Sequence, residues 1–425
     1  MVLIASIYES ILLWGTTMIF SGLDPLFLGD AGTFEILLIV LLKVLVAFSL
    51  LLVSVMLYIW WMRKLIGAMQ NRIGPNRAGP FGILQTLADG IKLFFKEDLI
   101  PNKSDKFVFK LAPFISIVPA LLVFCVVPVA GDFSSDGDGT VTWFGNETFV
   151  QVADPHVGIL FVLAMSSIAV YGIMLAGWSS GSKYPLLGSV RASAQMVSYE
   201  AALGLALVAV LLKTGTLSTH DIALQQSNGI PDWGLVVTGF VPFFIFFIAA
   251  TAELNSPPFD LVEAEQELVG GFHTEYSSIR FALFYMAEFM NVITMSAVMV
   301  TLFFGGPSGY YPNFGPAWLW GLLWFMGKVF VFASTFVWMR GTLPRPRYDQ
   351  LMDLGWKLLI PLALGWVLLI AALDIFEDRG YGSGPAQILI VLISIVVILV
   401  FGALLMSAIQ KGQKRRDREG EEVFG

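Results

Sequence analysis

The sequence predicts an all-α protein that crosses a membrane about nine times. Hydrophobic residues make up 56% of its 425 residues and charged residues only 13%, whereas about a quarter of an ordinary soluble domain is charged. Apolar runs of about 20 residues recur along the chain, and each is long enough to span a bilayer as a helix. Lys and Arg gather in alternate connections between these runs. Together these observations predict a polytopic membrane protein.

The apolar runs set the predicted order of elements. The expected spans cover residues 36–61, 111–131, 157–178, 197–213, 235–252, 281–304, 317–340, 356–374 and 386–409. Residues 1–20 are also apolar but contain Glu9, which favours a helix lying in the membrane interface, with a true span as the alternative.

The spans divide the chain into four expected regions. An N-terminal interfacial helix and outer segment occupies residues 1–35, and the main membrane domain occupies residues 36–375. An additional C-terminal span lies within residues 376–410, and a charged tail follows over residues 411–425.

The basic residues predict the orientation of the spans. Residues 62–110 hold nine Lys or Arg, and the later basic connections fall on the same side by alternation. The opposite connections are acidic and contain only Arg379. By the positive-inside rule the N-terminus is therefore expected outside and the C-terminus in the cytoplasm. The cytoplasmic connections are also the longer ones, so function is expected on that face.

The metal-binding residue types are scarce. The chain has one cysteine, Cys125, and three histidines. This inventory cannot supply a disulfide framework, a haem-attachment motif or a cysteine-ligated iron–sulfur site. We therefore expect no bound metal or cofactor on this chain, with any redox centre on a partner subunit. Membrane lipids are expected partners, and nucleic acid is not.

The first basic connection carries two features. Gly74-Pro75 and Gly79-Pro80 are turn signals, and residues 81–97 then place apolar side chains at helical spacing, which predicts an amphipathic helix in the membrane interface. A lipid-binding surface anchor is one interpretation of its lysines. Arg72 and Arg77 favour a more specific role, because lipid binding requires neither the turn nor their spacing.

Two further positions fall at the ends of spans. The sequence predicts a short loop over residues 179–196, which contains Arg191. Glu200 follows at the start of the next span, where it either caps the helix N-terminus or acts in the functional site.

Ionisable residues also fall inside the predicted spans. They are Lys43, Glu288 and Lys328. Such residues are costly in hydrocarbon and usually indicate function, with structural pairing between helices as the alternative. The two lysines require partner carboxylates, on this or another subunit.

An acidic segment lies between two spans on the cytoplasmic side. It contains Glu253, Asp260, Glu263, Glu265, Glu267 and Glu275, with Arg280 as the nearby basic residue. A solvated acidic surface is the ordinary interpretation. Three of the carboxylates have the spacing i, i+3, i+7, which would place them on one face of a helix. Packed carboxylates share protons, which favours a proton relay.

These motifs resemble a known family. The matching segments are Arg63-Lys64, Gln70-Asn71-Arg72-Ile73-Gly74-Pro75-Asn76-Arg77, Phe94-Phe95-Lys96-Glu97-Asp98, Ala176-Gly177-Trp178, Arg191-Ala192-Ser193-Ala194-Gln195, Ser198-Tyr199-Glu200, Pro258-Phe259-Asp260, Glu263-Ala264-Glu265-Gln266-Glu267-Leu268, Glu275-Tyr276-Ser277 and Leu343-Pro344-Arg345-Pro346-Arg347-Tyr348-Asp349. They resemble the H subunits of NADH-quinone oxidoreductase, the bacterial counterparts of mitochondrial NADH dehydrogenase subunit 1. The resemblance covers roughly residues 36–375.

The resemblance implies a subunit of respiratory complex I in a bacterial plasma membrane. Such a subunit contains a core of eight spans, joins the peripheral arm to the membrane arm, and forms the quinone access tunnel. Flavin (FMN) and iron–sulfur clusters would lie on the partner subunits. The quinone chamber would include Arg63, Arg72, Arg77, Arg191, Phe259 and Asp260. The proton relay would include Glu200, Asp260, Glu263, Glu265, Glu267, Glu275 and Glu288.

The sequence departs from the family pattern at two places. Met62 stands where family members usually carry Glu before the basic pair, and the span at residues 386–409 exceeds the family core. A membrane subunit of an ion-translocating hydrogenase is one alternative, although the complete basic loop favours the quinone enzyme. A free-standing secondary transporter is another, but it predicts an internal repeat that inspection of the sequence does not show.

Overall fold

The predicted spans are confirmed over most of the chain. A computed structural model describes residues 24–27, 32–134, 137–261, 268–312, 314–376 and scattered positions between 389 and 400. Within these residues, seven helical segments are long and apolar enough to cross a membrane: α2 (Thr33–Met69), α4 (Lys106–Phe124), α5 (Gly158–Ser179), α6 (Lys183–Thr214), α11 (Ser278–Phe303), α12 (Ala317–Thr342) and the segment Tyr348–Ile375.

A shorter apolar helix, α9 (Phe240–Glu253), takes the place of the fifth predicted span. The first eight predicted spans each correspond to one of these helical segments, so the prediction of an all-α polytopic membrane protein is confirmed. The expected helix at residues 1–20 lies outside the described residues. The predicted ninth span, 386–409, does so as well, apart from the scattered positions.

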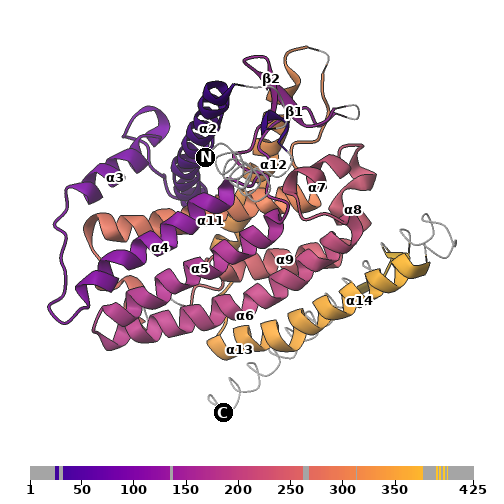
Figure 1. Cartoon of the computed structure of the whole chain (residues 1–425). Coiled ribbons are helices and arrows are strands. Elements are labelled where there is room, and N and C mark those ends of the chain that lie inside the picture. Colours follow the sequence, from indigo (N-terminus) through magenta and orange to yellow (C-terminus); the bar gives the residue numbers. More distant parts are fainter. Residues whose placement is uncertain are drawn as a thin grey trace, which may run out of the picture.

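Several helices pack side by side, with α6 among them in contact with α5, α9 and α14 (Ile360–Phe376). In Figure 1, α4, α5 and α6 run side by side, and α9 and the segment ending in α14 pack against α6. The most buried span is α11, which contacts α4, α12 and α2. Its inner residues include the small side chains of Thr294, Ser296 and Ala297, which let neighbouring helices approach closely.

The helix α6 begins much earlier than predicted. Residues 183–196 were expected to form a loop, but α6 starts at Lys183, so the loop prediction was wrong. Ser182 precedes the helix in an extended conformation, and Pro185 lies in the first turn, where its missing N–H costs nothing. Arg191 is therefore a helical residue. Glu200 lies in the middle of α6, which excludes a role as an N-cap.

The connection at residues 132–156 is more ordered than an ordinary loop. Strands β1 (Thr140–Trp143) and β2 (Asn146–Phe149) form an antiparallel hairpin, and Trp143 pairs with Asn146 across a two-residue turn. Phe144 and Gly145 both have positive φ, at 52° and 85°, as in a type I′ turn. The hairpin is a small addition to an otherwise helical fold.

Short helices complete the connections. The connection at residues 214–234 contains α7 (Thr219–Gln225) and η4 (Ile230–Asp232), and α8 (Gly234–Val237) precedes α9. The segment η2 (Pro25–Phe27) packs against β2, and η5 (Gly271–His273) packs against α6. The last described span consists of α13 (Tyr348–Asp353), a π-helical turn η6 (Leu354–Leu359) and α14.

The amphipathic helix after the first span is confirmed as a helix. After η3 (Pro80–Gly82), α3 (Gln85–Phe94) contacts α2 and α11, and in Figure 1 it lies at the end of the molecule away from the hairpin. Among its apolar side chains, Leu87, Ile91 and Phe94 are all about half exposed or more. An exposed apolar face of this kind suits a helix in the membrane interface.

Asp154 forms a buried polar contact between α5 and α7. Both carboxylate oxygens of Asp154 lie 2.9 Å from the Ser218 hydroxyl, which donates the hydrogen bond, and Asp154 is almost fully buried. Burial, more than the nearby Asp221, raises the pKa of the Asp154 carboxyl to about 6. Because folding raises this pKa, the folded protein is most stable when Asp154 is protonated, that is, below the pKa of the carboxyl in the unfolded chain. This contribution to the free energy of unfolding is lost as the pH rises through about 6.

We expect Asp154→Asn to remove this decrease of the free energy of unfolding with rising pH, because asparagine does not ionise. The variant should gain stability relative to the wild type as the pH rises from about 4 to 7, by up to about 3 kcal/mol. Thermal unfolding of the two proteins at several pH values within this range measures the difference. A difference that does not change with pH would contradict the assignment.

Candidate functional site

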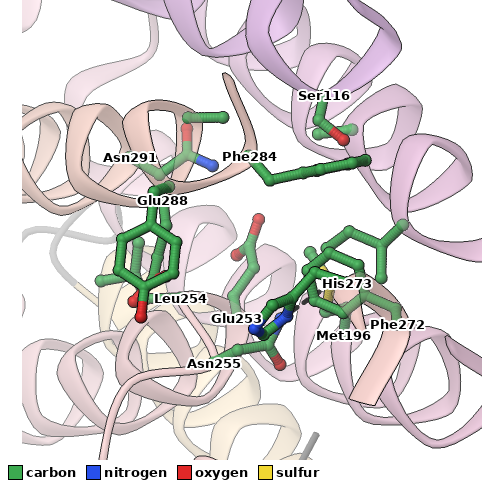
Figure 2. Close-up of a pocket in the computed structure, with 14 residues that line it drawn as sticks. Ser116, Met196, Glu253, Leu254, Asn255, Phe272, His273, Phe284, Glu288 and Asn291 are labelled. Carbon is green, nitrogen blue, oxygen red and sulfur yellow. Dashed lines mark hydrogen bonds between the residues drawn. The ribbon is translucent and has the colours of Figure 1, made fainter. Parts of the chain in front are cut away.

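A pocket lies among α4, α5, α6, α11 and the segments that follow α9 (Figure 2). Its polar lining residues are Ser116, Glu253, Asn255, His273, Glu288 and Asn291. The pocket has a volume of about 50 Å³. A bound water needs about 10–15 Å³, so the pocket has room for several.

Glu253 lies in the middle of this pocket. In Figure 2 its carboxylate stands between Glu288 and Asn291 on one side and His273 on the other. Glu253 is the last residue of α9 and is 7% exposed. Its Oε2 atom accepts no hydrogen bond among the described residues. A buried oxygen without a donor, beside free volume, is a typical position for bound water.

A second, smaller cavity of about 20 Å³ also has Glu253 in its wall. Ser166 of α5 and Thr294 of α11 line it. The Thr294 hydroxyl, like that of Ser116 in the first pocket, has no hydrogen-bond partner among the described residues. The Glu253 carboxylate therefore lies between two small polar cavities.

Two carboxylates line these cavities, and Glu200 interacts electrostatically with one of them. The Ser167 hydroxyl of α5 donates a hydrogen bond to Glu200 of α6. Glu200 in turn is close enough to Glu253 for electrostatic repulsion, and Glu288 of α11 lines the same pocket as Glu253. Burial lowers the pKa of His273 to about 4, so this side chain is neutral at pH 7. The site is therefore an acidic cluster with room for water.

Asp260 and Phe259 lie a few residues beyond Glu253. Asp260 is 6% exposed, and Arg345 Nη2 donates a hydrogen bond to its Oδ2 at 3.0 Å. The Phe259 ring stacks on Tyr199 of α6 with centroids 6.2 Å apart. In the same region, the Arg191 guanidinium lies 5.9 Å from the centre of the Tyr348 ring. The structure thus places Arg191 in the N-terminal half of α6 and Phe259 and Asp260 beside it.

Gln195 ties this segment to α6. It is fully buried, and its side-chain amide donates to the carbonyl oxygens of Ala252 at 2.8 Å and Phe259 at 2.9 Å. Ala252 is adjacent to Glu253, and Phe259 is adjacent to Asp260. One side chain therefore fixes the positions of both carboxylates.

The three arginines at the end of α2 form a separate group. Arg63 pairs with Asp89 of α3, and Arg72 Nε donates to Gln70 Oε1 at 2.7 Å, while Arg77 is exposed. The turn after α2 folds back on the helix, since Arg72 N donates to Gly67 O at 2.9 Å. Arg63 thus contacts α3, and Arg72 contacts the turn that contains it.

The loop itself is tightly packed. Gly82 has a φ of +78°, and a Cβ at this position would lie 2.4 Å from Pro75 O. A side chain is therefore excluded there for two reasons, backbone conformation and space. The compact loop holds the turn of residues 70–77 in a fixed shape.

Met62 contacts a cation rather than supplying a carboxylate. It is 9% exposed, and Arg340 Nη1 of α12 lies 3.6 Å from its Sδ atom. A thioether is a weak acceptor and does not compensate the charge of the guanidinium. The departure from the family pattern therefore leaves Arg340 with a much weaker partner than a carboxylate.

The remaining acidic positions divide into two groups. Glu263, Glu265 and Glu267 lie outside the described residues, as does the expected helical face that they would share with Asp260. Glu275 is half-buried, and five residues later Arg280 Nη2 pairs with Asp98 at 3.0 Å. That pair connects the segment after α3 to the start of α11.

The two intramembrane lysines differ in their partners. Lys43 is 3% exposed and pairs with Asp24 of this chain, so the expected carboxylate partner is confirmed. Lys328 instead donates to three carbonyl oxygens, of Phe304 at 2.7 Å, Gly306 at 3.0 Å and Ser308 at 2.7 Å. Within the described residues, carbonyl dipoles beyond the end of α11 hold the Lys328 ammonium, and a carboxylate partner on another subunit stays a prediction.

Comparison with known proteins establishes the family. Residues 42–371 match the family model described as NADH dehydrogenase. The chain is 46% identical over 390 residues to the H subunit of NADH-quinone oxidoreductase from Frankia casuarinae, covering 91% of this chain and 82% of that one. It is also 46% identical over 349 residues to the corresponding H subunit from Streptomyces avermitilis, covering 81% and 75%. The chain belongs to the family of NADH-quinone oxidoreductase H subunits.

Membership of this family confirms the resemblance inferred from the motifs. It favours the quinone enzyme over an ion-translocating hydrogenase or a free-standing transporter. Three further residues belong to the site by their contacts, although the sequence analysis did not assign them to it: Glu253, Gln195 and Arg345. The signal in the sequence for Glu253 was its position, since it is the first carboxylate after a long apolar run.

Proposed function

We propose that this membrane subunit of NADH-quinone oxidoreductase forms part of the path by which quinone reaches its reduction site. We further propose that it passes the resulting change of protonation into the membrane through Glu253, Glu200 and Glu288. The observation that carries this proposal is the acidic pocket, which Glu253 of α9 and Glu288 of α11 line and which lies next to the segment containing Phe259 and Asp260, with Glu200 of α6 close enough to repel Glu253. In this proposal the basic connections face the cytoplasm, with the N-terminus outside.

The quinone chamber is proposed to lie beside the cytoplasmic half of α6. Phe259 stacks on Tyr199 there, and the Arg191 guanidinium lies over the ring of Tyr348. Aromatic faces and cations suit a ring with two carbonyl oxygens, because the rings stack and the cations donate hydrogen bonds. The exposed group of Arg63, Arg72 and Arg77 would form the basic wall on the α2 side.

Gln195 supports a physical connection between chamber and relay. A change of charge at the quinone that displaces Phe259 or Asp260 acts on the Gln195 amide, which also holds the Ala252 carbonyl. The next residue is Glu253. A carboxylate cluster with water-sized spaces can respond to such a displacement by exchanging protons among its members.

The electrons are proposed to come from partner subunits. One cysteine cannot ligate an iron–sulfur cluster, and the family resemblance implies that flavin also lies on other subunits. FMN and iron–sulfur clusters are therefore assigned to peripheral subunits, and subunits of the membrane arm would receive the protonation change. The Glu263, Glu265 and Glu267 carboxylates remain proposed members of the relay, with Glu275.

We expect Glu253→Gln to uncouple the complex. Glutamine keeps the shape of the side chain but cannot carry a proton as a carboxyl group does. Proton transfer through the pocket should slow by about 100-fold or more, the lower range for the loss of a proton-transfer group, so proton pumping per quinone reduced should fall well below that of the wild type. Proton uptake and NADH oxidation by inverted membrane vesicles give this ratio.

Glu97→Gln is the matched control, because Glu97 is exposed and lies outside the pocket. It should leave the ratio unchanged. Full pumping per quinone reduced in the Glu253→Gln complex would exclude Glu253 from the relay. The same measurement on Glu267→Gln tests the proposed continuation.

A photoreactive quinone analogue tests the chamber separately. In isolated membranes the label should reach residues 62–77 and the segment around Phe259, and excess quinone should compete with it. Label confined to other subunits would contradict the proposed chamber and leave the relay to be judged by the pumping ratio alone.

A further inference from the structure

An apolar cavity lies on the opposite side of the molecule from the acidic pocket. Its walls come from α2, α4, α12 and the hairpin, and it has a volume of about 220 Å³. Most of its lining is hydrocarbon: Val46, Ala47, Leu50, Phe124, Val127 and Leu322 are representative. An apolar cavity of about 150 Å³ in a soluble protein can bind benzene, so this cavity is large enough for a hydrocarbon chain.

The depth of the cavity places it in one half of the bilayer. Trp60 and Trp61 of α2 mark the boundary on the side of the basic connections, where aromatic side chains favour the interface. Lys43 lies roughly 26 Å of helix away from Trp60, which is close to the hydrocarbon thickness of about 30 Å. The cavity extends from Lys43 towards Leu50. In the proposed orientation this is the outer leaflet.

The borders of the cavity include residues that face lipid. Val46 of α2 and Trp318 of α12 line it and are 42% and 41% exposed. Trp143 of the hairpin lines it as well and is half-buried. Two tryptophans at an interfacial depth are typical of a contact with the headgroup region.

The polar groups around the cavity indicate the kind of lipid. Lys43 is already compensated by Asp24, and the nearby Glu35 and Glu147 are exposed. This surface therefore repels an anionic headgroup. Gln151 is 4% exposed and lines the cavity, and its Oε1 atom accepts no hydrogen bond among the described residues. A ligand that carries an N–H donor would satisfy this oxygen.

We propose that the cavity binds an acyl chain of an outer-leaflet phosphatidylethanolamine. The chain would fill the hydrocarbon-lined space between α2, α4 and α12. The headgroup ammonium would face the acidic surface and supply the donor that Gln151 lacks. This site is separate from the quinone path, and of the proposed function it uses only the orientation.

A photoreactive lipid tests the site directly. The intact complex is placed in bilayers that contain phosphatidylethanolamine with a diazirine on the acyl chain, and labelled peptides are identified by mass spectrometry. Label should concentrate on residues 43–50 of α2 and on residues 318–322 of α12. Unlabelled phosphatidylethanolamine should compete with it better than phosphatidylcholine, which has no N–H donor, or anionic phosphatidylglycerol.

A cavity-filling variant supplies the matched comparison. Ala47→Phe should reduce labelling by about tenfold, as expected from the loss of about two buried methylene contacts. Val53→Phe, on an exposed face of the same helix, should not reduce it. Gln151→Leu should remove the preference over phosphatidylcholine while keeping the chain in the cavity.

Three results would overturn the proposal. Equal labelling in the two phenylalanine variants would mean that the label reports only lipid around the helix. Equal competition by all three lipids would contradict the headgroup assignment. Residues 1–23 continue directly from Asp24 beside the cavity, so label that appears only after deletion of residues 1–20 would assign the cavity to this chain's own N-terminal segment.

Discussion

Lys43→Met should lower the free energy of unfolding by about 3–5 kcal/mol, the usual effect of breaking a buried ion pair. Lys43 is 3% exposed and Asp24 5%. Asp24 also accepts hydrogen bonds from the Thr148 hydroxyl at 3.0 Å and from Leu26 N at 3.1 Å. Methionine fills the space of the lysine stem but leaves the Asp24 carboxylate buried without its cation. This pair joins α2 to η2 and β2, so the variant should loosen the hairpin first.

A double variant shows whether the loss of stability comes from the unbalanced charge of Asp24 or from lost packing at residue 43. Asp24→Asn in the Lys43→Met background removes the stranded charge and should recover part of the stability. Lys357→Met is the control, because Lys357 pairs with Asp353 at 2.7 Å while both side chains are more than half exposed. An exposed pair of this kind contributes at most about 1 kcal/mol. Thermal unfolding in membranes, followed by protease accessibility of the hairpin, compares the variants. If Lys43→Met were as stable as Lys357→Met, the pair would not hold the hairpin.

Hydrophobicity predicted the spans because the bilayer imposes the same length and composition on each of them. This argument locates the apolar part of each helix, but it does not predict polar turns that continue the helix beyond the membrane. It therefore missed the first turns of α6, where Lys183, Arg191 and Gln195 face protein or solvent rather than lipid. The hairpin was missed for a different reason. Its alternating residues and the Phe144-Gly145 turn were visible in the sequence, but they were few next to the long apolar runs.

The site was only partly predictable because its residues meet through packing between helices. The rule that a buried lysine needs a partner predicted a carboxylate for Lys43, although the rule could not say that Asp24 supplies it. For Lys328 the same rule did not anticipate that three carbonyl oxygens beyond the end of α11 provide negative potential within this chain. Likewise, no spacing in the sequence indicated that Glu200 and Glu253, more than fifty residues apart, face each other across α6 and α9.

Arg345→Ala should reduce quinone reduction by at least about tenfold, because it removes the guanidinium that pairs with the buried Asp260 carboxylate, and losing a partner of a buried charge costs about 2 kcal/mol or more. Asp260 is 6% exposed and receives its hydrogen bond from Arg345 at 3.0 Å. Loss of the guanidinium weakens the hydrogen bonding that holds the Asp260 carboxylate in place, so the carboxylate should shift. This shift moves Phe259, whose carbonyl is held by Gln195. The rate of NADH oxidation with added quinone, measured over a range of quinone concentrations, tests the expectation.

Arg347→Ala is the matched control, since Arg347 is exposed and lies two residues from Arg345 on the same segment. It removes the same charge from the same surface, so a general electrostatic effect would lower both activities equally, and that result would contradict a specific role for the pair. Asp260→Asn in the Arg345→Ala background then separates two causes. Recovered activity would mean that the Asp260 charge, once Arg345 was lost, had displaced the segment. Activity that stays low would mean that the Asp260 carboxylate itself is needed, as expected if it is the point where the chamber meets the relay.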